Sequence, residues 1–224
     1  MNILGIDASN KGIIIALKKD NKIFVKESYE KNSGTYIITL INEILKENNL
    51  TIDDINLYGC TIGPGSFTGI RIAIAAIQGL LFNRNKKVVP IISTEILFKS
   101  SSHLTHQKIA ILKRARVDAA YIHIFNNGIS EFGPELVEIS KIPEITDGAI
   151  LLGEEAEYFK EKLKLPNILE YAKYNPESLI EQIIENNEKS VSPSELKVLY
   201  LQKPLAVENF EKKHNISIDN EIYN

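Results

Sequence analysis

Apolar and polar residues along the first hundred positions follow two periods, which predict strands at first and alternating helices and strands afterwards. Apolar runs at 3–6 and 13–17 are separated by turn-forming residues, and alternation over 22–26 predicts a third strand, so the chain is expected to begin as a β-meander. The elements expected after the meander are a helix at 36–45, a strand at 57–62, a helix at 70–82, a strand at 87–92 and a helix at 94–100.

The second half of the chain repeats this order of elements in a shorter form. Two apolar runs and the hairpin signal Asn126-Asn127-Gly128 predict a second meander, with a strand and two helices after it at 149–153, 154–163 and 176–187. The order resembles the ribonuclease-H-like unit of the actin-like ATPase (ASKHA) fold. We therefore expect an α/β protein with two such lobes, the second reduced.

A polar stretch at 100–106 marks the expected boundary between the lobes. It predicts an N-terminal lobe at 1–102 and a C-terminal lobe at 103–210. The charged and polar residues at 211–224 are expected to form a flexible tail.

A glycine-containing loop, Gly63-Pro64-Gly65-Ser66-Phe67-Thr68-Gly69, connects a predicted strand to a predicted helix. Free backbone N–H groups at a helix start can bind an anion, so one interpretation is a phosphate-binding loop. Ile70 and Arg71 follow it, where a Walker loop has Lys and then Ser or Thr, which excludes that motif. We favour a tight connection in which Ser66 or Thr68 caps the helix.

Asp7, at the end of the first predicted strand, could hold a metal-bound phosphate, as carboxylates at that place do in actin-like ATPases. The following turn contains a single glycine, Gly12, so we expect a turn-capping aspartate instead. A nucleotide or other anion, if bound, would meet Asp7, Gly65, Ser66 and Thr68. A small actin-fold ATPase or kinase using Asp7 and the glycine loop is the alternative function.

The predicted helices at 36–45 and 70–82 are apolar over more of their circumference than a helix packed on one sheet requires. Either a partner covers the second apolar face or both faces are buried within this chain, and we expect a partner. Arg71 opposes the helix dipole, which suggests a nearby carboxylate, phosphate or partner surface, although its long stem could also reach water. The expected interface consists of Tyr36, Ile37, Leu40, Ile41, Ile44, Arg71, Ile74, Ile77, Gln78 and Leu81.

Composition and charge narrow the class of protein. Of the 224 residues 44% are hydrophobic and 25% charged, and the formal net charge is -3, which disfavours a stand-alone tRNA-binding module. Cys60 is the only cysteine, so no internal disulfide can form. No apolar run approaches the roughly 20 residues of a membrane helix. We expect a cytoplasmic protein without membrane contact.

Two segments resemble the TsaB (YeaZ) family. The loop and helix start from Gly63 to Arg71 are similar to that family's signature, and Ile3 to Ser9 resembles its opening strand. The resemblance covers mainly the first hundred or so residues, with weaker similarity at Ala115-Arg116, Tyr121 and Leu199-Tyr200-Leu201. The chain departs from the family's His-Ser-Glu, Asp-Ala-Arg and Tyr-Leu-Arg patterns, where it has Asn32-Ser33-Gly34, Arg114-Ala115-Arg116 and Tyr200-Leu201-Gln202.

This resemblance implies a non-catalytic subunit of the machinery that makes threonylcarbamoyladenosine (t6A) in tRNA. In that system the catalytic paralogue TsaD transfers a threonylcarbamoyl group to adenosine, and TsaE is an accompanying ATPase. The resemblance implies that the chain pairs with TsaD, recruits TsaE, forms a homodimer when alone and meets tRNA only through the complex. It also implies no cofactor of its own, with ATP and metal on the TsaD and TsaE partners.

TsaD-like proteins carry two histidines four residues apart on the helix after the fifth strand, a spacing that places both rings on one helix face to hold a metal. Ser93 and Leu97 stand at the corresponding positions, so we expect neither that metal site nor a catalytic residue. His103 and His106 lie three residues apart in a polar stretch and are expected at the surface.

Overall fold

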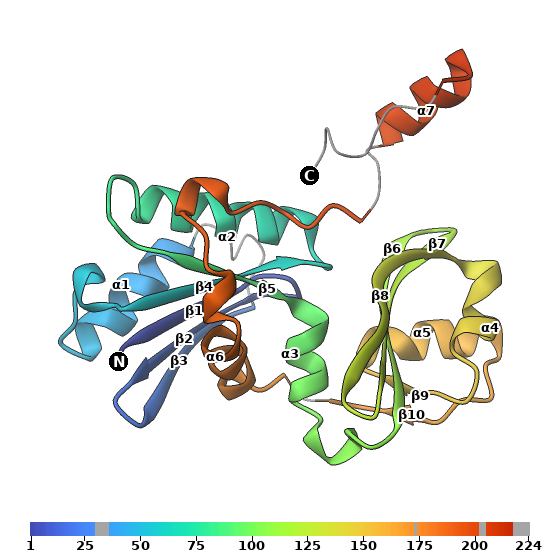
Figure 1. Cartoon of the computed structure of the whole chain (residues 1–224), viewed down its shortest axis with the longest axis horizontal. Coiled ribbons are helices and arrows are strands. Elements are labelled where there is room, and N and C mark those ends of the chain that lie inside the picture. The colour runs from blue at the N-terminus through green and yellow to red at the C-terminus, as the bar shows by residue number, and fades with distance from the viewer. Residues whose placement is uncertain (30–35, 173, 202–204, 217–224) are drawn as a thin grey trace.

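The protein, described here by a computed structural model over residues 1–29, 36–172, 174–201 and 205–216, forms two lobes, each built on a five-stranded sheet (Figure 1). The strands of the first sheet are β1 (Ile3–Asp7), β2 (Ile13–Lys19), β3 (Lys22–Ser28), β4 (Leu57–Gly63) and β5 (Val88–Ile92). Those of the second sheet are β6 (Lys108–Arg116), β7 (Ala119–Asn126), β8 (Ile129–Glu138), β9 (Ile150–Leu152) and β10 (Leu169–Glu170).

The two sheets have the same topology. Their strand orders are β3-β2-β1-β4-β5 and, read from the opposite edge, β10-β9-β6-β7-β8. In each sheet the first strand pairs antiparallel with the second and parallel with the fourth. The expectation of two α/β lobes with the second reduced is confirmed, since β9 has 3 residues and β10 has 2.

Helices cover both faces of the first sheet (Figure 1). On one face lie α1 (Ile37–Glu47) and α2 (Phe67–Leu80), whose apolar side chains pack with those of β1, β2 and β4. On the other lie α3 (Ser93–Lys99) and α6 (Pro176–Glu185). The expected helix at 70–82 begins earlier because Ser66 caps it, its Oγ accepting a hydrogen bond from Gly69 N at 3.3 Å.

The lobe boundary differs from the expected one. Leu179 and Ile183 of α6, which the sequence assigned to the C-terminal lobe at 103–210, are buried against the first sheet beside Ile3. The chain then stays with the first lobe, because Val191 exchanges backbone hydrogen bonds with Val88. The prediction was wrong for 176–201, since an apolar stripe specifies that a helix packs but not on which sheet.

The remaining elements are short or terminal. The second lobe contains α4 (Ile142–Ile145) and α5 (Glu154–Leu163), and α7 (Leu205–His214) lies beyond both lobes (Figure 1). Of the expected tail at 211–224, residues 217–224 lie outside the described part of the chain. The 3-10 helices are η2 (Ile52–Asp54), η3 (Ser102–Leu104), η4 (Ile139–Lys141), η5 (Asn187–Lys189) and η6 (Pro193–Glu195).

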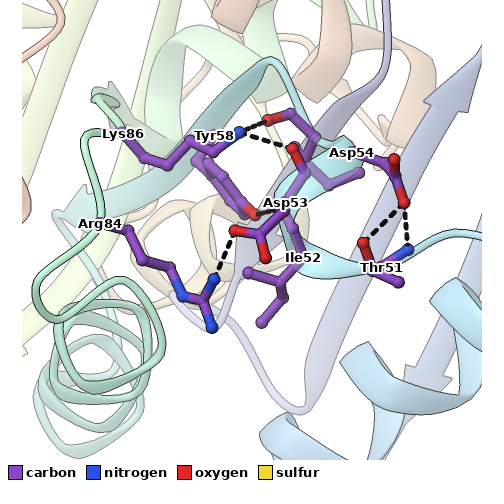
Figure 2. Close-up of polar contacts among 8 residues, drawn as sticks. Thr51, Ile52, Asp53, Asp54, Tyr58, Arg84 and Lys86 are labelled. Carbon is purple, nitrogen blue, oxygen red and sulfur yellow. Dashed lines mark hydrogen bonds and ion pairs between the residues drawn. The ribbon is translucent and has the colours of Figure 1, made fainter.

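Polar contacts fix the ends of the α1 and α2 layer (Figure 2). The Arg84 side chain, after α2, pairs with the Asp53 carboxylate, and Lys86 Nζ donates to the backbone oxygen of the same Asp53 at 2.8 Å. Beneath them the hydroxyl of the buried Tyr58 donates to Ile52 O at 2.6 Å. These bonds join the segment after α2 to the segment before β4, so α2 is held at a fixed position on the sheet.

Replacing Tyr58 with phenylalanine should lower the free energy of unfolding by about 1–2 kcal/mol, because Ile52 O loses its donor in a partly buried place. Tyr171→Phe is the matched control. It removes a hydroxyl that donates to Glu157 at an exposed site, so it should change stability by less than about 0.5 kcal/mol. Urea unfolding of both variants measures the difference, and equal losses would show that the Tyr58 bond adds nothing.

Candidate functional site

The turn after β1 is organised by Asp7, whose side chain is buried. Its carboxylate accepts hydrogen bonds from Ser9 N at 2.9 Å, from Thr61 Oγ1 at 2.7 Å and from Asn10 Nδ2 at 3.3 Å. These bonds hold the turn in place and tie it to β4. The structure thus gives Asp7 the turn-capping role that the sequence favoured.

The glycine loop packs directly on this turn. Ser66 N donates to Ser9 O at 2.7 Å, and the backbone of Gly65, at a φ of +152°, comes so close that an added Cβ would lie 2.1 Å from the same oxygen. Gly69 N is already bonded to Ser66 Oγ. Two of the N–H groups that a phosphate would need are therefore used within the protein, which supports the tight-connection interpretation.

A cleft of about 1730 Å³ lies between the two lobes, and the structure brings the turn and the loop together in its wall. The first lobe contributes Ser9, Gly65, Ser66 and Thr68, and the second contributes Lys113 together with the start of α5. Asp7 lies directly behind this wall. Three of the four residues named as possible anion contacts therefore line the cleft, and the fourth positions the turn.

Six side chains of the expected partner interface face inward instead. They are buried in the first lobe's core, where they pack on β1, β2 and β4, because a stripe with this spacing faces the sheet that the helix covers. The structure shows these six side chains buried within the chain, which is the alternative that the sequence left open. They are Ile37, Ile41, Ile44, Ile74, Ile77 and Leu81.

The other four interface candidates lie at or near the surface. Tyr36 is exposed and Leu40 is half-buried. Gln78 donates through Nε2 to Leu196 O at 3.0 Å, so its amide serves the fold. The Arg71 guanidinium lies 4.6 Å from the centroid of the Phe67 ring, which accounts for a cation at this helix start without a bound anion.

Some apolar and small residues on these helices are exposed, and the sequence did not distinguish them from the buried ones. Along the outer face of α2, Thr68, Ile72, Ala75 and Gly79 are all exposed at intervals of four, three and four residues. Ile38 and Phe82 are also exposed. The helical period could have distinguished these positions from the inward ones, had the covered face been known.

Ser93 and Leu97 have structural contacts. The Ser93 hydroxyl donates to Pro64 O, and Leu97 packs beside the second lobe's apolar cluster. His103 and His106 are exposed, as expected. Among the residues that the structure describes, no group of three or more His, Cys, Asp or Glu side chains is placed to hold a metal ion.

His123 lies between the lobes and was not singled out from the sequence. Its ring, 1% exposed, bonds Thr94 Oγ1 of α3 through Nδ1 at 2.7 Å and Ser130 Oγ of β8 through Nε2 at 2.9 Å. Burial lowers the pKa of His123 to about 4. Phe98 of α3 stacks on Phe125 of β7 beside it, with ring centroids 4.0 Å apart.

This histidine should make the protein less stable in mild acid. The unfolded chain binds its proton near pH 6.5 and the folded one near pH 4, so the contribution is complete above about pH 6.5 and is lost as the pH falls toward about pH 4. Urea unfolding at about pH 7 and about pH 4.5 should differ by about 2 kcal/mol more for the protein than for a His123→Gln variant. An equal pH dependence for both would contradict this assignment.

None of the described helices is both long and apolar enough to cross a lipid bilayer. The fold itself is matched by a solved structure, YeaZ from Pseudomonas aeruginosa, with a TM-score of 0.74 and 19% identity over 89% of this chain and 99% of that one. This match and the repeated sheet topology confirm the expected actin-like fold.

Sequence comparison points to the same group of proteins. The family model TsaD, tRNA N6-adenosine threonylcarbamoyltransferase, matches residues 22–207. The chain is 30% identical over 129 residues to the tRNA threonylcarbamoyladenosine biosynthesis protein TsaB of Buchnera aphidicola subsp. Baizongia pistaciae, a match that covers 56% of this chain and 58% of that protein. It is 29% identical over 120 residues to TsaB of Escherichia coli, covering 53% and 51%.

The chain thus spans little more than half the length of these curated relatives. The family model, in contrast, covers most of the chain and includes both lobes. From these matches together, the chain belongs to the TsaB (YeaZ) family of tRNA threonylcarbamoyladenosine biosynthesis proteins, within the wider family of that threonylcarbamoyltransferase model.

Proposed function

We propose that this protein is the non-catalytic partner of a TsaD-like threonylcarbamoyltransferase and binds it through the outer face of α1 and α2. The observation that carries the proposal is the exposed face of α2, where Ile72 lies among the small residues Thr68, Ala75 and Gly79. Small side chains let a second helix approach closely, and ridges three and four residues apart are those that interlock between helices. An added Cβ at Gly79 would meet nothing within 4 Å, so the surface is open there.

Other residues extend this face beyond α2. Ile38 of α1 and Tyr36 directly before it are exposed, and α1 and α2 cover the same face of the first sheet (Figure 1). Phe67 at the start of α2 is exposed and packs against Tyr200, with ring centroids 6.0 Å apart. The contact proposed for TsaD is thus a helix-on-helix surface, which a homodimer would use when TsaD is absent.

Support for a non-catalytic role comes from the chemistry of the described residues. The positions of the expected histidine pair hold Ser93 and Leu97, each with a structural contact. We assign catalysis, ATP and metal to the TsaD and TsaE partners, and contact with tRNA to the assembled complex. Recruitment of TsaE and a cytoplasmic location are part of the same proposal.

The direct test mixes the purified protein with TsaD from the same organism and measures mass by size-exclusion chromatography with light scattering. A one-to-one complex at micromolar concentration is expected. The reciprocal control is each protein alone at the same total concentration. Separate elution of the two proteins at every ratio would contradict the proposal.

An ATPase or kinase using Asp7 and the glycine loop has less support. The Asp7 carboxylate already accepts three hydrogen bonds from the protein, and Ser66 N and Gly69 N are also bonded within it. Calorimetry with Mg-ATP separates the two functions. One-to-one binding of Mg-ATP that Asp7→Ala abolishes would favour the ATPase or kinase over the subunit role.

A further inference from the structure

The floor of the interlobe cleft contains polar groups that the proposed function does not use. Ser9 is 2% exposed and its Oγ has no hydrogen-bond partner among the described residues. The buried hydroxyl of Tyr174, which also lines the cleft, interacts with the Asp7 carboxylate. Burial and the nearby Asp7 carboxylate raise the pKa of Tyr174 well above its usual value, so this hydroxyl keeps its proton. A buried hydroxyl without a partner, such as that of Ser9, is unusual in proteins and calls for a ligand or another polar group.

A buried lysine of the second lobe lines the same cleft. Lys113, on β6, is 4% exposed, and its Nζ donates to Asn10 Oδ1 of the first lobe at 2.7 Å. Asp7 and Glu155 act on it through space, but within the described part of the chain its one hydrogen-bond partner is this neutral amide. Burial accordingly lowers the pKa of Lys113. An ammonium group has three donors, so two remain here, and a buried cation without a paired anion is costly.

The unpartnered Ser9 hydroxyl and the Lys113 ammonium group thus line the same cleft, one from each lobe. Ser9 and Asn10 are adjacent in the turn after β1, so the Lys113 contact brings the second lobe beside the unpartnered Ser9 hydroxyl. What the Ser9 hydroxyl and the two remaining Lys113 donors lack is a hydrogen-bond acceptor. We propose that the cleft floor binds a small oxyanion, phosphate or carboxylate, between Lys113 and Ser9.

This site is distinct from a nucleotide site built on Asp7 and the glycine loop. The anion would be held by Lys113 and Ser9, whose donors are not used by Asp7 or by the glycine loop. Lys113 supplies charge and Ser9 a hydrogen bond, as is common where an anion is held in a partly dry site. Since the two residues belong to different lobes, a bound anion would also join the lobes. The inference does not depend on the subunit role proposed above.

Thermal unfolding of the full-length protein with inorganic phosphate or acetate, against chloride at equal ionic strength, tests the site. A saturable rise in Tm is expected, since a ligand that binds only the folded state stabilises it. A rise with phosphate alone assigns a phosphoryl ligand, and a rise with acetate as well assigns a carboxylate. Ser9→Ala should weaken the apparent affinity about tenfold and Lys113→Met should abolish the rise.

Lys11→Met is the matched control, because Lys11 also lines the cleft but is exposed, and it should keep the full rise in Tm. Lys113→Met without added anion is expected to fold at least as well as the wild type, since it replaces a buried charge by an apolar chain of similar length. If Lys113→Met does not fold, the result for Ser9→Ala alone decides the test. The inference is overturned if neither anion gives a saturable rise, or if Ser9→Ala and every folded Lys113 variant retain it unchanged.

Discussion

Replacing Ala75 with arginine should weaken association with TsaD at least about hundredfold, because a charged side chain would enter the centre of a helix pair with no partner for its charge. Ala75 is exposed on the outer face of α2, between the buried positions Ile74 and Ile77, so the change leaves the core intact. The free energy of unfolding should therefore change by less than about 0.5 kcal/mol. Titration calorimetry with TsaD measures the loss, and sedimentation of the protein alone should show the same loss of self-association.

Ile184→Arg is the matched control for that experiment. Ile184 is 41% exposed on α6, which covers the opposite face of the first sheet. An arginine there should leave the affinity for TsaD within about twofold of the wild-type value. If Ala75→Arg binds as tightly as this control, the outer face of α2 is not the interface.

A second large effect is expected from a single methyl group at Gly69. An added Cβ would lie 2.3 Å from Ala8 O and 3.1 Å from Ser66 Oγ, so Gly69→Ala must push the glycine loop away from the turn after β1. We expect the free energy of unfolding to fall by about 2–4 kcal/mol, although alanine itself favours a helix over glycine by about 1 kcal/mol. Chemical unfolding measures this value.

Gly79→Ala provides the comparison within the same helix. No atom lies within 4 Å of the added Cβ, so this variant should be more stable by up to about 1 kcal/mol. Opposite signs for the two glycines are the expected result. Two stabilised variants would mean that the loop does not pack on the first turn as closely as the structure shows.

The order of strands and helices was predictable from sequence because it depends on local periodicity. Both meanders, the Ser66 cap and the helices α1, α2, α3, α5 and α6 follow from spacing and turn residues. The sheet on which α6 packs could not be predicted in this way, since its apolar stripe fits either sheet equally well. The packing of Leu179 and Ile183 against Ile3 joins residues that are far apart along the chain.

The candidate surface was predictable only in part for a related reason. The sequence identified two broadly apolar helices but selected their inward residues, since neither Ile74 nor Ala75 reveals which side meets the sheet. The cleft groups depended on contacts between lobes, such as that of Lys113 with Asn10, which are 103 residues apart in the sequence. Spacing within one element contains no information about such pairs.

If this protein supports t6A synthesis by binding a catalytic partner, its loss should lower the amount of t6A in the cell. The most direct test is the t6A content of bulk tRNA, measured by mass spectrometry after depletion of the protein in its own cells. We expect t6A to fall on depletion and to return with the wild type and with Ile184→Arg but not with Ala75→Arg. Unchanged t6A after depletion, or full recovery with Ala75→Arg, would contradict this role.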